Sequence, residues 1–277
     1  LQFVAAETRG AQLAFLGNGS GGRVTGFQGA LGVNSAGELR GLQLAAVNHV
    51  RDGSEGLQAG FVNYAGGPLE GIQGGLFNYA GEKVEGAQLG PSVNFAADVT
   101  GAQVGFVNVA QRVEGVQLGL INVADEVHGV PIGLVSVTKE GGVHPLVWYS
   151  NITPLNAAVK FATKYTYSFI NASWDVDASL VGPGGGLGAT IPAFAPRLFV
   201  DIDVGATYLF RDSGPADDGR TLARLRGMLR YQFLPHLSVF AGGGYTGQID
   251  RPHDASGAIT GDYYYRSLGE FVAGVGL

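Results

Sequence analysis

Hydrophobic and polar residues alternate along several segments in the second half of the chain. The segments that share this pattern are residues 198–210, 221–233, 237–247 and 271–277. In the first of them, Asp201 and Asp203 occupy the polar set of positions. In the second, Arg224, Arg226 and Arg230 do. Because successive side chains of a β-strand point to opposite faces, this period of two predicts strands with one apolar and one polar face.

Aromatic residues gather near the ends of these predicted strands. They are Tyr149, Tyr165, Tyr167, Tyr208, Phe210, Tyr231, Phe233 and residues 263–265. One strand is expected over residues 160–169, with Tyr167 and Phe169 on its apolar face and Lys160 opposite them. Aromatic girdles around an apolar outer face are typical of transmembrane β-barrels. A soluble β-sandwich also alternates, and it is the alternative for this half of the chain.

The charged residues of the polar faces are the candidate site. Asp201 and Asp203 lie on one predicted strand, and the three arginines lie on the next. Opposite charges on neighbouring strands can pair across a water-filled interior. We predict that Asp201, Asp203, Arg224, Arg226 and Arg230 form a charge network in the barrel lumen that influences which solutes pass. The structural alternative is a set of ion pairs that only keeps the barrel closed.

The first half of the chain repeats one short phrase nine times between Gly10 and Thr138. Each copy has a glycine, a glutamine two positions later, and an asparagine five or six positions after the glutamine. The opening glycines are Gly10, Gly26, Gly41, Gly56, Gly71, Gly86, Gly101, Gly115 and Gly129. The glutamines are Gln12, Gln28, Gln43, Gln58, Gln73, Gln88, Gln103 and Gln117, and the asparagines are Asn18, Asn34, Asn48, Asn63, Asn78, Asn94, Asn108 and Asn122. The ninth copy has Pro131 and Ser136 instead. A period of 14 to 16 residues is too short for a pair of helices and fits β-structure.

Two adjacent apolar residues interrupt the alternation in five of the copies, as Leu120 and Ile121 do. If the interruption is a β-bulge, each copy is one strand of a barrel, and its amide side chains point inward. If it is a corner, each copy is one coil of a β-solenoid, with the apolar residues inside and the amides along the surface. The residues that exchange faces between these alternatives are Gly115, Gln117, Gly119, Asn122 and Ala124 on one side, and Val116, Leu118, Leu120, Ile121 and Val123 on the other.

The number of strands favours a single barrel. Nine repeat strands and about seven later strands give about sixteen, an even number within the range of bacterial outer-membrane barrels. We therefore predict an all-β fold, an antiparallel outer-membrane barrel in which each repeat supplies one strand. Residues 1–142 form the repeat region and residues 143–277 the aromatic strand region of one continuous domain. The alternative is an N-terminal β-solenoid followed by a smaller C-terminal barrel.

Composition removes several classes of function. The net charge of −6 provides no basic surface, so we expect no nucleic-acid partner. The chain has no cysteine, and its five histidines are scattered, so we expect no metal site and no cofactor. No nucleophile and base are suitably spaced, so we expect no enzymatic activity. Charged residues make up 14% of the chain, well below the roughly 25% of soluble domains, which agrees with a membrane protein.

The repeat phrase also resembles a known group of proteins. In one copy it is formed by Gly115, Gln117, Gly119, Asn122 and Ala124. Followed by a β-rich segment such as residues 156–170, it resembles the surface-repeat proteins predicted in bacterial outer membranes. That resemblance implies an envelope location and little about activity. A weaker similarity links the phrase to curlin repeats, whose units are longer and lack an aromatic second half.

We therefore expect an integral protein of the bacterial outer membrane and cell surface. The first functional hypothesis is a porin-like passive channel whose lumen is lined by glutamine, asparagine and glycine. The alternative is a non-transporting surface or structural repeat protein, solenoid-like or adhesin-like, anchored in the membrane. Membrane lipid is the expected partner, and small solutes or other envelope proteins are further candidates.

Overall fold

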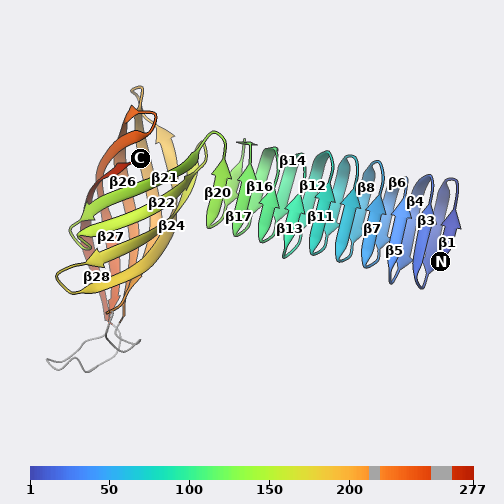
Figure 1. The fold of residues 1–277 in the computed structure, drawn as a ribbon, viewed down its shortest axis with the longest axis horizontal. Helices are drawn as coiled ribbons and strands as arrows, with labels where there is room; N and C mark the ends of the chain where they lie inside the picture. Colours follow the sequence, from blue (N-terminus) through green and yellow to red (C-terminus); the bar gives the residue numbers. More distant parts are fainter. Residues whose placement is uncertain (212–218, 251–263) are drawn as a thin grey trace. The chain divides into compact units, whose positions relative to one another are not determined.

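The computed structural model describes residues 1–211, 219–250 and 264–277, in which all regular secondary structure is β-strand. Two compact units divide the chain, Leu1–Glu140 and Gly141–Leu277 (Figure 1). This boundary lies two residues before the one expected from the sequence. Within the described residues, no helix has the length and hydrophobicity needed to cross a membrane.

The first unit is a β-solenoid. Its strands are β1 (Gln2–Val4), β2 (Thr8–Ala14), β3 (Gly17–Ser20), β4 (Arg23–Ala30), β5 (Val33–Ala36), β6 (Glu38–Leu44), β7 (Val47–Val50), β8 (Ser54–Ala59), β9 (Val62–Ala65), β10 (Leu69–Gly74), β11 (Phe77–Ala80), β12 (Lys83–Leu89), β13 (Val93–Phe95), β14 (Asp98–Val104), β15 (Val107–Val109), β16 (Arg112–Leu118), β17 (Ile121–Ala124), β18 (Glu126–Val127), β19 (Val130–Ile132) and β20 (Val135–Thr138). They form two parallel sheets of ten strands each. Equivalent residues of successive copies are paired, as Gln73 is with Gln88 and Asn78 with Asn94.

This topology corrects the prediction of one sixteen-stranded barrel. Each complete repeat supplies two short strands, one carrying the glutamine and one carrying the asparagine, and they belong to different sheets. In the eighth copy, β16 ends at Leu118 and β17 begins at Ile121, so the interruption of the alternation is a corner. Parallel pairing of successive copies excludes the antiparallel barrel connectivity for the repeats. The connectivity is that of the alternative hypothesis.

The faces of the solenoid, however, are the reverse of those expected for a solenoid. Gln117 and Asn122 are buried, whereas Val116, Leu118 and Leu120 are exposed. The corner shifts the phase of the side chains, so that the amides of both strands point inward together. Apolar residues, most of them valine and alanine, form a core in the rest of the interior, including Leu69, Val84, Val99, Ala80 and Ala96.

The glycine that opens each repeat is required by the close stacking of the coils. Gly86 has a φ of 139°, a conformation that residues with a Cβ rarely adopt. A Cβ at this position would also meet the carbonyl oxygen of Gly71 in the preceding coil. Only glycine fits both conditions, and the same two conditions hold at Gly26, Gly41, Gly56, Gly71, Gly101 and Gly115.

The second unit is a closed antiparallel barrel of eight strands (Figure 1). They are β21 (Gly142–Ser150), β22 (Leu155–Ala162), β23 (Thr166–Asp175), β24 (Leu180–Pro192), β25 (Leu198–Leu209), β26 (Arg220–Leu234), β27 (Leu237–Asp250) and β28 (Tyr264–Gly276). Each strand pairs with the next, and β28 pairs with β21 to close the sheet, with Trp148 opposite Gly274. An antiparallel barrel of this kind has no free sheet edge.

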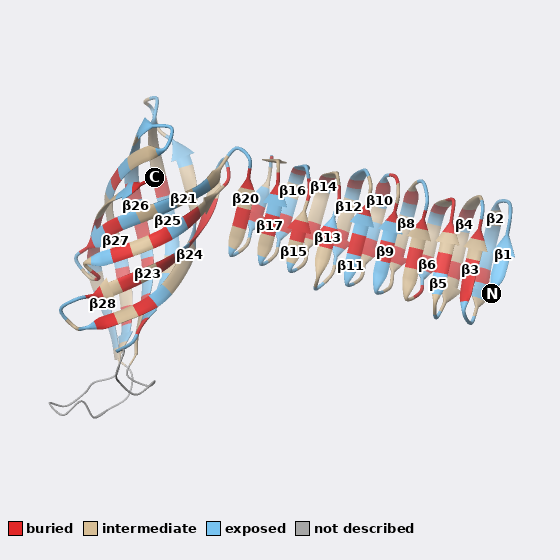
Figure 2. Cartoon of the chain, viewed as in Figure 1, coloured by how far each residue is buried: buried red, intermediate tan, exposed pale blue. Residues whose placement is uncertain are grey.

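The alternation predicted for the second half matches the faces of this barrel. Ile202, Leu225 and Leu229 are exposed, while Asp203 and Arg226 are buried. Figure 2 shows buried and exposed residues alternating along the barrel strands. In all eight described strands, the outward positions carry no Asp, Glu, Lys or Arg.

The strand expected over residues 160–169 is wrong. β22 ends at Ala162 and β23 begins at Thr166, with a turn in which Thr163 hydrogen-bonds to the backbone of Thr166. The turn reverses the chain and resets the alternation. Tyr167 and Phe169 therefore point into the barrel, as Lys160 does, and they are not part of an outer aromatic girdle.

Candidate functional site

The barrel interior brings the five predicted charged residues inside one closed sheet. Asp201 and Asp203 lie on β25, and the three arginines lie on the adjacent β26. In the strand register, Asp203 is directly opposite Arg226. Asp201 is opposite Met228, which leaves it diagonal to Arg230. The pairing therefore follows from the two-residue spacing of the charges on each strand.

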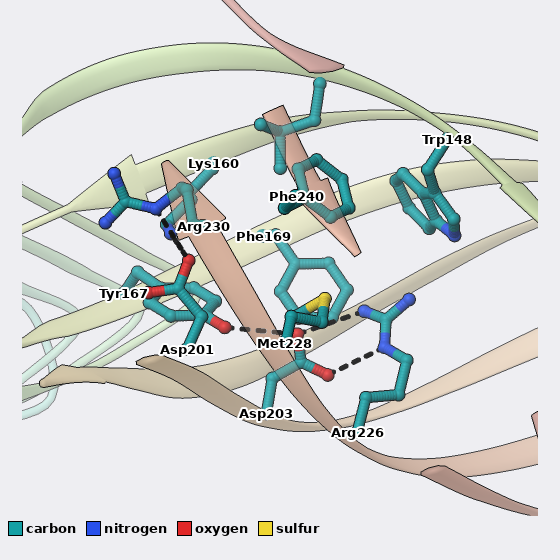
Figure 3. Close-up of a pocket in the computed structure, with 11 residues that line it drawn as sticks. Trp148, Lys160, Tyr167, Phe169, Asp201, Asp203, Arg226, Met228, Arg230 and Phe240 are labelled. Carbon is teal, nitrogen blue, oxygen red and sulfur yellow. Dashed lines mark hydrogen bonds and ion pairs between the residues drawn. The ribbon is translucent and has the colours of Figure 1, made fainter. Parts of the chain in front are cut away.

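Asp203 and Arg226 form a bidentate ion pair (Figure 3). Arg226 Nε donates to Asp203 Oδ1 at 2.8 Å, and Nη2 donates to Oδ2 at 3.1 Å. The hydroxyl of Tyr167 donates to Asp203 Oδ2 at 3.1 Å. The guanidinium also lies 5.2 Å from the ring centre of Trp148 and 5.5 Å from that of Phe169. The buried carboxylate is thus held by hydrogen bonds, and the buried guanidinium is held by hydrogen bonds and by the faces of two aromatic rings.

Asp201 is the centre of a second cluster. Its Oδ2 accepts hydrogen bonds from Arg230 Nε at 2.8 Å and from Lys160 Nζ at 3.1 Å, and its Oδ1 accepts one from Thr190 at 2.6 Å. Lys160 also lies 3.7 Å from the ring centre of Tyr167. The two clusters therefore meet at Tyr167, which contacts Asp203 on one side and Lys160 on the other (Figure 3).

Arg224 belongs to a third group, with a partner that the sequence reasoning missed. Its Nε lies 3.5 Å from Oε1 of Glu270 on β28, and its terminal nitrogens donate to the hydroxyls of Thr207 and Thr153. Glu270 in turn accepts a hydrogen bond from Thr246 at 2.8 Å. The alternation of residues 271–277 already placed even-numbered residues inside, so extending that strand by one residue toward the N-terminus would have identified Glu270.

The interior is filled by these side chains. A cavity of about 30 Å³ lies among them, bounded by Asp201, Asp203, their cationic partners and the apolar side chains of Trp148, Phe169, Met228 and Phe240. A water needs about 10–15 Å³ of such space, so the cavity has room for about two waters. Eight strands enclose an interior just wide enough to be packed with side chains.

The predicted glutamine and asparagine ladder lies in the solenoid and not in the barrel. In the glutamine ladder, each Nε2 donates to the Oε1 of the preceding copy, as Gln73 does to Gln58 at 2.8 Å. In the asparagine ladder, each Nδ2 donates to the Oδ1 of the following copy, as Asn63 does to Asn78 at 2.9 Å. The remaining amide hydrogens reach backbone carbonyls, as that of Gln73 reaches Tyr79 at 3.0 Å.

The ladders run through every copy that has the amides. The fully buried members are Gln28, Gln43, Gln58, Gln73, Gln88, Gln103, Asn34, Asn48, Asn63, Asn94 and Asn108, with Asn78, Gln117 and Asn122 nearly so. The glutamine ladder ends where Pro131 replaces glutamine, and Gln117 Oε1 has no hydrogen-bond partner there. The asparagine ladder ends in a hydrogen bond from Asn122 to Ser136 at 3.3 Å.

A catalytic or metal-binding arrangement is not evident among the residues described. No three His, Asp or Glu residues in that part of the chain are grouped as metal ligands. His49 stacks on Tyr64, and His144 hydrogen-bonds to the backbone of Gly141. His253 lies outside the described residues.

Comparisons with known proteins identify no family. No family model matches the sequence, and no curated protein matches it. One similar solved structure is described as "De novo design of transmembrane beta-barrels". It is 17% identical, the match covers 48% of this chain and 90% of that chain, and the TM-score is 0.29. At that TM-score the likeness carries no further argument.

Proposed function

We propose that this chain is an integral protein of the bacterial outer membrane whose barrel is a non-conducting anchor for the repeat array. The observation that carries the proposal is the distribution of charge in the barrel. On the described strands, Asp, Glu, Lys and Arg occupy inward positions, where Asp201, Asp203 and Glu270 are each paired with a cation, and the outward positions of all eight strands carry none of these four residue types.

The outer face of the barrel has the chemistry of a lipid-facing surface. Exposed apolar side chains occur on every strand, and Val147, Val159, Ile170, Val204 and Leu229 are examples from five of them. A monomer in water rarely exposes a continuous apolar surface of this extent. Strands of about nine to eleven residues cross a bilayer when tilted, and β24 to β28 exceed that length. An antiparallel barrel leaves no unpaired backbone group toward lipid.

The filled interior favours an anchor over a channel. A porin needs more strands to leave a water-filled passage, about sixteen in the general porins. The glutamine and asparagine ladders, expected to line such a passage, are hydrogen-bonded within the solenoid instead. The charged side chains of the described barrel strands are bonded to one another across the interior, and the cavity among them is about 30 Å³.

The outer-membrane location rests on the architecture and on the repeat phrase. Transmembrane β-barrels of bacteria reside in that membrane. The phrase resembles surface-repeat proteins of the same compartment. In this proposal membrane lipid is the partner of the barrel, and the solenoid is the part of the chain available to other envelope components.

Planar-bilayer recording of the purified full chain tests the proposal. We expect the protein to need detergent to remain monodisperse, to float with phosphatidylcholine vesicles after reconstitution, and to produce no stepwise conductance. Flotation is the control that the silent protein has inserted. Stable single-channel steps from inserted protein would overturn the anchor in favour of the channel. A protein that stays monodisperse in plain buffer would overturn membrane insertion itself.

A further inference from the structure

The outer surface of the solenoid has two chemically distinct edges. The Asp, Glu, Lys and Arg residues from Glu7 to Glu126 lie in the segments that directly precede the opening glycine of a copy, and Lys139 and Glu140 follow the last strand, β20. We call this side the charged edge. The opposite side, the apolar edge, consists of the outward positions just before and after the glutamine, the corner, and the position before the asparagine. In the fifth copy these positions are Ile72, Gly74, Leu76 and Phe77.

The apolar edge projects from the solenoid. Phe61 and Phe106, both at corners, are 65% and 60% exposed, and Phe77 is 50% exposed. None of its positions in the nine copies holds an ionisable residue. Nine copies at a spacing of about 4.8 Å make the edge about 38 Å long. A continuous exposed apolar surface of this length marks an interaction site.

An aromatic row separates the two edges on one face of the solenoid. The rings of His49, Tyr64, Tyr79 and Phe95 stack in sequence, with centroid distances of 5.1, 4.9 and 5.1 Å. Each lies two residues after an apolar-edge position and before the charged residues of the next copy. Tyrosine rings with an apolar body and a polar tip concentrate where lipid meets water.

The shape of the apolar edge favours lipid over a second protein surface. Apolar residues occupy both sheets and the corner that joins them, so the surface is a ridge with two diverging flanks. A flat sheet from a second copy would cover one flank and leave the other in water. A lipid leaflet surrounds a ridge on all sides. The ridge is about 13 Å deep, from four residues at about 3.3 Å each, and apolar faces of interfacial segments enter a leaflet by about 5–10 Å.

We propose that the apolar edge of the solenoid is embedded in the outer part of a lipid leaflet, with the charged edge in water. This inference rests on the proposed membrane anchor, because the barrel is the part of the chain that brings the solenoid to a bilayer.

Depth-dependent fluorescence quenching tests this placement on the full chain. The protein has no cysteine, so single-cysteine variants can be labelled with the polarity-sensitive dye NBD without background. Phe77→Cys reports the apolar edge, and Glu70→Cys, in the same copy, reports the charged edge. Leu225→Cys reports the outward face of the barrel. The three are reconstituted into phosphatidylcholine vesicles containing lipid with a nitroxide at a shallow or a deep acyl position.

We expect the Phe77 label to lose most of its fluorescence to the shallow quencher and less to the deep one. The Leu225 label is quenched as well, and the Glu70 label is not. A quenched Leu225 label beside an unquenched Phe77 label overturns the embedded edge and leaves the barrel anchor standing. In that case, energy transfer between Phe77 labels would identify a second copy as the occupant. An unquenched Leu225 label overturns the proposed anchor, and with it this inference.

Discussion

The barrel and the solenoid both place polar side chains inside and apolar side chains outside, but they satisfy those polar groups in different ways. In the barrel, unlike residues from different strands pair, as Asp203 and Arg226 do. In the solenoid, like pairs with like, since each glutamine bonds to the glutamine of the preceding copy. A carboxylate only accepts hydrogen bonds and needs a different residue as donor, whereas an amide is both donor and acceptor.

This difference determines how each interior can grow and how it can fail. An amide ladder repeats one residue indefinitely, so it suits an array of copies. An ion-pair network must be completed locally, so it suits a closed barrel of fixed size. Loss of one partner leaves a buried charge in the barrel but only neutral groups in the solenoid, and an unpaired buried charge costs more. The predicted effects of substitution follow that order.

The two units can be monitored separately. Both tryptophans, Trp148 and Trp174, lie on barrel strands. Tryptophan fluorescence therefore follows the barrel, while far-ultraviolet circular dichroism follows the strands of both units. Each prediction below specifies which signal changes for the full chain in detergent.

The largest effect is expected for Asp203→Leu. The substitution leaves Arg226 buried without its carboxylate and removes the acceptor of the Tyr167 hydroxyl. Breaking a buried pair in this way lowers the free energy of unfolding by about 3–5 kcal/mol. Urea unfolding followed by tryptophan fluorescence measures the loss.

The double variant Asp203→Leu with Arg226→Met is the control for charge. It replaces both partners by apolar residues and removes the stranded guanidinium, so we expect it to recover most of the lost stability. A double variant as unstable as the single one would show that the packing of Asp203, and not the unpaired charge, causes the effect.

Gln73→Leu interrupts the middle of the glutamine ladder and should cost somewhat less. Gln58 Oε1 loses its donor, and Gln88 Nε2 loses its acceptor. Two neutral groups left unpaired cost about 2–4 kcal/mol together. The transition seen by circular dichroism should move to lower urea while the tryptophan transition stays in place.

Gln12→Leu, in the first copy, is the matched substitution. It removes one ladder bond, the one that Gln28 donates at 2.7 Å, and Gln12 Nε2 has no partner to lose. We expect a loss of about 1 kcal/mol. Equal losses at Gln12 and Gln73 would contradict the idea that the ladder is held from both neighbouring copies.

Gly86→Ala tests the backbone stacking of the solenoid. The added methyl group meets the Gly71 carbonyl, and the φ of 139° strains any residue with a Cβ. We expect a loss of about 1–3 kcal/mol in the circular dichroism transition. Gly74→Ala is the comparison, because a Cβ there has nothing within 4 Å, and its effect should stay within about 0.5 kcal/mol.

The faces of the barrel could be predicted from the sequence because a strand has only two sides. Once Asp201 and Asp203 share a side in residues 198–210, apolar neighbours such as Ile202 must face the other way. The strand limits could not be predicted in the same way. The turn that begins at Thr163 is closed by the hydrogen bond from the Thr163 hydroxyl and contains no glycine or proline that would mark it in the sequence. The predicted strand therefore continues through the turn and places Tyr167 and Phe169 on the wrong face.

The solenoid shows where a repeat pattern is ambiguous. The spacing of Gln117 and Asn122 predicts a shared face only if the phase shift between Leu120 and Ile121 is known. A bulge and a corner shift the side-chain phase by the same amount. From the sequence we predict inward amides only for the bulge, but the corner found in the structure also turns them inward. The pairing direction between copies decides the topology, and no single copy contains that information. The tendency of identical amides to form ladders between stacked copies is the signal that favours parallel stacking.

The smallest effect is expected for Asp52→Asn on the charged edge of the solenoid. Hydrogen bonding from Arg51 lowers the pKa of Asp52 below its ordinary value. The ionised form is therefore favoured by folding, and its contribution is present above the unfolded pKa of about 3.9 and is lost as the pH falls through the lower folded value. Both side chains are solvent-exposed, so screening keeps this contribution small. We expect the wild type and Asp52→Asn to melt at nearly the same temperature at pH 7, and any difference to shrink as the pH falls below about 3.9. A large difference at neutral pH would show that surface charge supports the solenoid as strongly as its buried ladders do.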